Sequence, residues 1–235
     1  MSTAVEAPPP IKPSVRTSRL ADPFWTVADL VESLGGIPLH RIRLVPPPGT
    51  ATEEDVLNQK ACELVSGVIV ERAMGYFESR LAVILLYLIE DWLTSSKLGY
   101  CNGEGALTRL EPGNIRMPDV SFVRWERVGG MVPREPICGV SPNLAVEILS
   151  RSNTRNEIDR KRAEYFNAGV ELVWIVDPLK QVIEVWTTPK DCHLVGPEDV
   201  LNGEAVLPGF RLSVRDWFAR AGQQSPEASS ENPNS

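Results

Sequence analysis

Apolar residues along the chain alternate between stretches with helical spacing and short runs typical of β-strands. The longest apolar run, LAVILLYLI at residues 81–89, lies within a helix predicted over about residues 77–97. Two runs rich in β-branched residues, CELV and VIVE, are separated by Ser66 and Gly67, which predicts a hairpin. Strands are also predicted in GYCNGEGALTRL, NIRMPDVSFVRW, NLAVEIL, ELVWIVDP and QVIEVWTT, and LPGFRLSVRDWFA predicts a last strand and a short helix. This order of elements predicts a mixed α/β fold.

Three threonines mark predicted helix starts. Thr26 precedes apolar positions at helical spacing, and Thr52 precedes acidic residues that suit the positive end of a helix dipole. Thr154 and Glu157 form a capping box, which predicts a helix to about residue 168 that Gly169 ends.

The chain divides by composition into four segments. Residues 1–20 and 221–235 are rich in Pro, Ser and Gln and have few large apolar groups, so we expect disordered tails. Residues 21–50 are predicted to form a helical appendage and a linker. Residues 51–220 are predicted to form the main domain.

The overall composition, 43% apolar and 23% charged, is that of an ordinary globular protein. With 24 Lys and Arg against 31 Asp and Glu, the net charge of −7 disfavours indiscriminate nucleic-acid binding but leaves room for a local basic patch. The four cysteines form no CxxC pair, so neither a zinc knuckle nor a redox motif is predicted. No apolar run approaches the roughly 20 residues of a membrane span, and residues 1–20 lack an apolar signal core. We therefore expect a soluble, cytoplasmic protein that has no membrane partner.

Three charged residues stand at positions where apolar neighbours predict burial. Alternation along NLAVEIL places Glu147 on the opposite face from Leu144, Val146 and Ile148. Such a carboxylate needs a cation, which is either a metal ion or a partner in a structural salt bridge. Another carboxylate, Asp119, begins the strand DVSFV.

The helix that follows adds an ammonium group. Lys161 shares one helix face with Thr154, Ile158 and Tyr165, so it points inward unless it extends to solvent. Two carboxylates and a Lys at one end of a sheet suit a hard cation such as Mg²⁺, which takes oxygen ligands and promotes phosphodiester hydrolysis.

Several motifs in order along the chain resemble those of a known nuclease family. MPDVSFV, NLAVEILSRSNT, the helix with Asp159, Lys161 and Tyr165, GVELVWIVDP and VIEVW are similar to the Uma-two family of restriction endonucleases, in the PD-(D/E)XK superfamily. The resemblance extends over about residues 52–218 and includes CELVSGVIVERAM and the terminal LPGF. It implies a restriction-endonuclease-like core, which is a mixed β-sheet flanked by helices, and hydrolysis of DNA.

The same resemblance implies roles for individual residues. Asp119, Glu147 and the Ile148 carbonyl would bind Mg²⁺ or Mn²⁺. The superfamily pattern places a Lys two residues after the second acid, but this chain has Leu149 there, so Lys161 is the candidate for that role. An additional acid would come from Glu78, which we favour slightly, or from Glu63.

Other roles are less specific. Tyr165 is expected to pack rather than to take part in catalysis. Two groups of arginines are either contacts for DNA phosphates or parts of a salt-bridged surface: Arg116, Arg124, Arg127 and Arg134, and Arg151, Arg155, Arg160 and Arg162.

Two alternatives to a metal-dependent endonuclease follow from the same residues. The missing strand Lys and the acidic net charge also suit a catalytically inactive domain of this fold that binds DNA or protein. In the second alternative, the two carboxylates act as the catalytic pair of a glycosidase, but the sequence shows no aromatic side chains placed to bind a sugar. If the protein cuts both DNA strands with one site per chain, a homodimer is expected.

Overall fold

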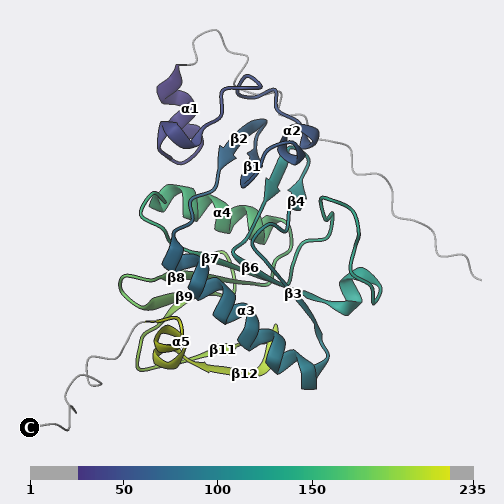
Figure 1. Cartoon of the computed structure of the whole chain (residues 1–235), viewed down its shortest axis with the longest axis vertical. Helices are drawn as coiled ribbons and strands as arrows, with labels where there is room; N and C mark the ends of the chain where they lie inside the picture. Colours follow the sequence, from purple (N-terminus) through teal and green to yellow (C-terminus); the bar gives the residue numbers. More distant parts are fainter. Residues whose placement is uncertain (1–25, 223–235) are drawn as a thin grey trace, which may run out of the picture.

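The computed structural model describes residues 26–222, which form a mixed α/β fold with sheets flanked by helices (Figure 1). A six-stranded sheet forms its centre, and all its strand pairs are antiparallel except β7 with β8. In order across the sheet, the strands are β10 (Cys192–Val195), β9 (Val182–Trp186), β8 (Leu172–Asp177), β7 (Leu144–Ile148), β6 (Val120–Arg124) and β3 (Gly99–Gly103).

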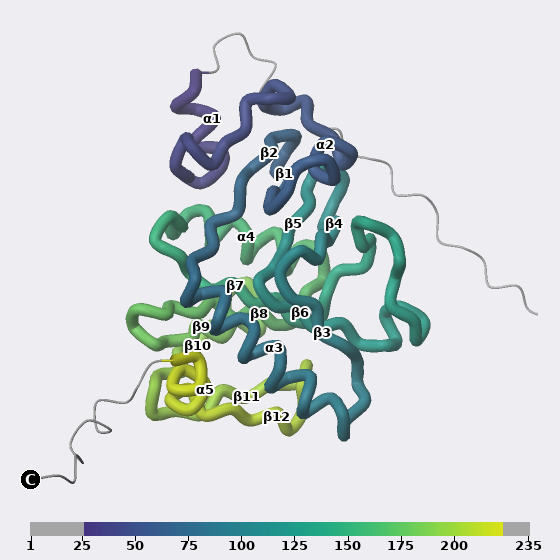
Figure 2. The backbone as a smooth tube through the Cα atoms, viewed as in Figure 1, coloured from purple at the N-terminus to yellow at the C-terminus, as the bar shows by residue number. Residues whose placement is uncertain are grey.

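Helices and a hairpin cover the two faces of this sheet (Figure 2). One face packs against α3 (Tyr76–Ser96), α5 (Val214–Arg220) and the hairpin of β11 (Val200–Gly203) and β12 (Leu207–Ser213). The other face packs against α4 (Arg155–Asn167), which is the crossover between the parallel strands β7 and β8. The apolar run at residues 81–89 lies within α3, so its prediction as a buried helix is confirmed.

A second sheet lies beyond α4 in Figure 1 and contains the predicted hairpin. Its strands, in order, are β2 (Val68–Glu71), β1 (Cys62–Val65), β5 (Asn114–Arg116) and β4 (Thr108–Glu111). The short helix α2 (Glu53–Leu57) packs on β1 through a small apolar cluster. The described residues also contain two 3₁₀ helices, η2 (Leu39–Arg41) and η3 (Trp125–Val128).

The local signals in the sequence correspond to the observed helix ends. Thr26, Thr52 and Thr154 are the N-caps of α1 (Val27–Ser33), α2 and α4, each with a capping box. Gly169 follows α4 with φ +87°, a left-handed conformation that glycine adopts without steric cost.

The predicted N-terminal appendage packs closely on the main domain. Leu30, Leu34 and Ile37 form an apolar cluster with Val68 and neighbouring residues of the second sheet. The Thr154 hydroxyl donates to the Gly35 carbonyl at 2.5 Å, which joins this segment to the start of α4. The predicted tail at residues 1–20, residues 21–25 of the predicted appendage and residues 223–235 of the predicted tail at 221–235 lie outside the described residues. Ala221, the first residue of that predicted tail, is instead buried in the main apolar cluster. The segment boundaries at residues 50 and 220 stay predictions.

No helix within residues 26–222 is long and apolar enough to cross a membrane. All four cysteines are free thiols.

Candidate active site

The charged residues singled out in the sequence meet between the central sheet and α4. Glu147 lies on β7, as the alternation predicts, and Lys161 and Tyr165 reach it from α4. Asp119 directly precedes β6, whose first residue, Val120, pairs with Val146. The side chains of Asp119, Glu147 and Lys161 are at most 6% exposed. The predicted inward orientation of Lys161 is therefore confirmed.

The carboxylate of Glu147 is held at both oxygens. Lys161 Nζ donates to Glu147 Oε2 at 3.0 Å, and the Tyr165 hydroxyl donates to Oε1. Burial, followed by the nearby charge of Glu147, raises the pKa of Tyr165 well above its ordinary value, so the hydroxyl stays a neutral donor. Tyr165 is packed in the core as predicted, but the sequence did not reveal this polar contact.

Asp119 is held in a similar way. Its Oδ2 accepts a hydrogen bond from the Ile148 N–H at 2.6 Å, and its Oδ1 forms an ion pair with Arg72. Burial and repulsion by Glu147 raise the pKa of Asp119 to about 7, although Arg72 and the Ile148 N–H act in the opposite direction. Glu147 therefore lies close enough to Asp119 to oppose the ionisation of Asp119.

Glu63 on β1 joins the same cluster. Lys161 Nζ lies 3.2 Å from Glu63 Oε1, and Arg116 Nη1 lies 2.8 Å from Oε2. Burial disfavours ionisation of Glu63, but the charges of Lys161 and Arg116 outweigh it and lower the pKa of Glu63 to about 2. Burial likewise disfavours the charged form of Lys161, but Glu147 and Glu63 outweigh it and raise the pKa of Lys161. Lys161 is thus an ammonium group held between two carboxylates.

The second predicted acid, Glu78, is placed differently. It lies in the first turn of α3 and lines a cavity of about 400 Å³ that Arg72 also lines. No ion pair of Glu78 with the cluster is found among the described residues. The structure therefore brings Glu63, rather than Glu78, into contact with Lys161.

The oxygen ligands present suit a divalent cation of the Mg²⁺ type. Each of the four carboxylate oxygens of Asp119 and Glu147 has a donor, and a carboxylate accepts at about four lone-pair sites, so acceptor capacity remains. Within residues 26–222, no group of three or more His, Cys, Asp or Glu side chains is arranged to hold a metal ion. Mg²⁺ commonly binds through one or two carboxylates together with water and phosphate, so two carboxylates are sufficient.

Most of the arginines considered as phosphate contacts are paired with acids instead. Arg116 is buried between Glu63 and Glu164, which makes it part of the interior. The other paired members are Arg124, Arg127, Arg155, Arg160 and Arg162. These ion pairs fit the salt-bridged alternative, and contact of these arginines with DNA phosphates stays a prediction. Arg134 and Arg151 have no ion pair within the described part of the chain.

Sequence reasoning missed Arg72, and it ranked Glu63 second. Glu63 interrupts the apolar strand CELV in the same way that Glu147 interrupts NLAVEIL, so the same signal was available. Arg72 follows β2 and meets Asp119 across 47 positions of sequence, and no local pattern indicates such a partner.

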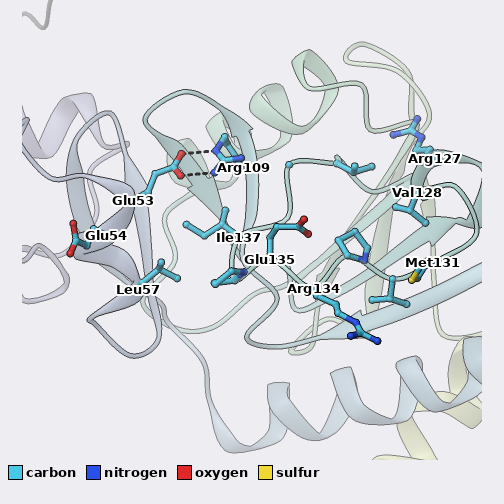
Figure 3. A pocket seen from close by; sticks show the side chains of 15 residues that line it. Glu53, Glu54, Leu57, Arg109, Arg127, Val128, Met131, Arg134, Glu135 and Ile137 are labelled. Carbon is cyan, nitrogen blue, oxygen red and sulfur yellow. Dashed lines mark hydrogen bonds and ion pairs between the residues drawn. The ribbon is translucent and has the colours of Figure 1, made fainter.

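A second cavity, of about 960 Å³, is larger than the one that Glu78 and Arg72 line and lies elsewhere in the molecule (Figure 3). It is lined by residues of α2 and of the segment 127–140, and Glu53 and Arg109, which also line it, form an ion pair. Asp119, Glu147 and Lys161 do not line it, so this cavity is separate from the carboxylate cluster.

Comparisons with known proteins show the family and the fold. Residues 53–215 match the model of the family Uma2, described as "Putative restriction endonuclease". The chain is also similar in structure to "a putative nuclease belonging to DUF820 from Anabaena variabilis ATCC 29413", with a TM-score of 0.63 and 19% identity. That similarity covers 72% of this chain and 98% of the other, and at this identity it shows a shared fold. No curated protein matches the chain.

Proposed function

Because the chain belongs to the Uma2 family, we propose that it is a divalent-metal-dependent endonuclease that hydrolyses phosphodiester bonds in DNA. The observation that carries the proposal is the buried pair of Asp119 and Glu147 with the ammonium group of Lys161 on Glu147. Burying two carboxylates that repel each other costs free energy. A metal-dependent reaction on a phosphate would explain why the protein keeps them together beside a fixed cation.

Asp119, Glu147 and the backbone carbonyl of Ile148 are the groups that would hold Mg²⁺ or Mn²⁺. When bound there, the metal ion would lower the pKa of a water molecule and polarise the scissile phosphate. The Ile148 N–H orients Asp119, and Tyr165 orients Glu147, so both carboxylates are held in place before any ligand arrives.

Lys161 supplies a fixed positive charge next to Glu147. Glu63 and Glu147 hold its ammonium group at 3.2 and 3.0 Å, so its position does not depend on substrate. From there it would orient the attacking water or stabilise the negative charge that develops on the phosphate oxygens. This is the role that the superfamily assigns to a Lys at the position of Leu149.

We further propose that the protein acts in the cytoplasm and that it acts on DNA as a homodimer, because cutting two strands with one site per chain favours symmetric pairing. Sedimentation of the purified protein with and without DNA tests the dimer. A monomer in both samples would contradict it.

The proposal is tested on supercoiled plasmid with Mg²⁺, and with EDTA as the metal-free control. Wild type is expected to nick the plasmid only with metal, and Asp119→Asn is expected to be slower by about 100-fold or more, since metal ligation contributes several kcal/mol. Asp177→Asn is the matched control. Asp177 ends the neighbouring strand β8, and its carboxylate pairs with Lys180 at 2.9 Å, outside the cluster. We expect wild-type nicking from this control.

Full nicking activity in Asp119→Asn, or nicking that persists in EDTA, would contradict the proposal. Wild type that neither binds metal nor nicks DNA would instead support the inactive DNA-binding or protein-interaction domain.

A further inference from the structure

Arg72 is a buried cation at the carboxylate cluster that the proposed reaction does not yet use. It directly follows β2, and its backbone N–H donates to the Ala61 carbonyl at 2.9 Å. Its side chain is only 3% exposed and forms an ion pair with Asp119. The same guanidinium also lies 3.2 Å from a carboxylate oxygen of Glu104, whose side chain is 44% exposed. Arg72 therefore has one partner inside the cluster and one toward solvent.

Arg72 is among the residues that line a cavity of about 400 Å³. We call it the Arg72 cavity, and its lining includes Arg41, Arg72, Gly75, Glu78, Ser150 and Arg151. Arg72 lines the cavity, and its guanidinium also contacts Asp119, the carboxylate proposed to bind metal.

The ion pair creates a conflict with metal binding. Arg72 holds Oδ1 of Asp119, and the Ile148 N–H holds Oδ2, so a divalent ion at Asp119 would lie beside a guanidinium of the same sign. Like charges a few ångströms apart repel strongly when water is largely excluded. Binding of a metal ion is therefore expected to move the guanidinium, and the adjoining cavity and Glu104 offer the space and the alternative partner.

We propose that Arg72 is an internal counter-ion that holds Asp119 in the metal-free protein and is displaced into the Arg72 cavity when a divalent metal binds. In the displaced position its guanidinium contacts a phosphate oxygen of the DNA next to the bond that is cut. A planar guanidinium suits phosphate because it donates two parallel hydrogen bonds. The inference rests on the proposed function and adds to it a residue that couples metal binding to substrate binding.

The decisive experiment measures Mn²⁺ binding by calorimetry to wild type, Arg72→Gln and Arg151→Gln at one pH and salt concentration. Removing the competing cation is expected to lower the Kd of Arg72→Gln for Mn²⁺ by about tenfold or more. Arg151 lines the same cavity and has no ion pair within the described residues, so Arg151→Gln controls for the general loss of positive charge. Its Kd is expected to stay within about threefold of wild type.

A second readout is plasmid nicking, which Arg72→Gln is expected to slow by about 100-fold despite its tighter metal binding, because a donor to phosphate is lost. A merely structural Arg72 would weaken metal binding and nicking together.

A third measurement does not depend on whether Arg72→Gln folds. The Nε–H resonance of Arg72 in wild type, assigned by its absence in Arg72→Lys, is expected to shift when Mg²⁺ is added. An unchanged resonance in metal-loaded protein would overturn the inference, as would an Mn²⁺ Kd of folded Arg72→Gln equal to or weaker than that of wild type. If the inference about Arg72 is overturned but wild type still binds Mn²⁺ and nicks DNA, the proposed function stands. If wild type binds no Mn²⁺, both fail.

Discussion

Replacing Arg41 by Met is expected to destabilise the protein strongly, although Arg41 lies outside the residues that match the family model. Arg41 sits in η2 and forms two hydrogen bonds with the Glu157 carboxylate, at 2.7 and 3.0 Å. The two side chains are 3% and 4% exposed. Arg41 also donates to the carbonyls of Glu71 and Ser152, so one side chain joins the N-terminal segment, β2 and the start of α4.

The magnitude follows from the burial of this ion pair. Removing one partner of a buried pair leaves an uncompensated charge and costs about 3–5 kcal/mol, which is a large part of a typical stability of about 5–15 kcal/mol. With an m-value of about 2 kcal/mol/M, the urea midpoint of Arg41→Met is expected to fall by about 1.5–2.5 M. Arg43→Met is the matched control, since Arg43 pairs with Glu71 at 2.9 Å but the two side chains are 48% and 40% exposed. An exposed pair of this kind contributes at most about 1 kcal/mol.

The pH dependence gives an independent check. Burial disfavours ionisation of Glu157, but the hydrogen bond from Arg41 and the charge of Lys161 outweigh it and lower the pKa of Glu157 in the folded protein. The stabilisation is therefore fully present above the unfolded pKa of about 4.3 and is lost as the pH falls through the lower folded value. The difference in free energy of unfolding between wild type and Arg41→Met should therefore shrink below about pH 4.3, as Glu157 becomes protonated. A loss under about 1 kcal/mol at pH 7, or a difference that persists unchanged in acid, would refute the reasoning.

Three further predictions concern the carboxylate cluster. Lys161→Met is expected to slow plasmid nicking by about 100-fold while Mn²⁺ binding persists in calorimetry, because the residue stabilises charge without holding the metal; loss of Mn²⁺ binding would contradict this role. Tyr165→Phe leaves Glu147 Oε1 without its donor, and the expected loss of about 1–3 kcal/mol in urea unfolding would be contradicted by unchanged stability. Glu63→Gln is expected to lose about 1.5–3 kcal/mol in urea unfolding because Lys161 and Arg116 each lose one of two carboxylate partners, whereas Glu78→Gln should change stability by under about 0.5 kcal/mol. The reverse order would show that the contacts of Glu63 are misassigned.

The parts of the fold that were predictable from sequence depend on local signals. Alternation along β7 correctly placed Glu147 on the face opposite Val146, and helical spacing on α4 correctly placed Lys161 inward. The capping boxes at Thr26 and Thr154 fix helix starts through contacts only three residues apart. Such patterns are visible in one sequence because the interacting groups are neighbours along the chain.

The contacts that sequence did not predict join residues that are far apart along the chain. Arg41 meets Glu157 across 116 positions, and Arg72 meets Asp119 across 47. Which acid pairs with which arginine depends on how the second sheet and the N-terminal segment dock onto α4, and no local periodicity carries that information. The same reason explains why Glu63 was ranked below Glu78. Both are acids at the start of suitable elements, and only the packing of β1 against α4 brings Glu63 to Lys161.

The most direct test of the central claim is the number of Mn²⁺ ions bound per chain by wild type and by Glu147→Gln, measured by calorimetric titration. The substitution keeps the size of the side chain and its hydrogen bond from Tyr165 can be retained, but it removes a proposed ligand charge. We predict one bound Mn²⁺ per wild-type chain and loss of that binding in folded Glu147→Gln. Equal binding by the two proteins would contradict the assignment of Asp119 and Glu147 as the metal centre.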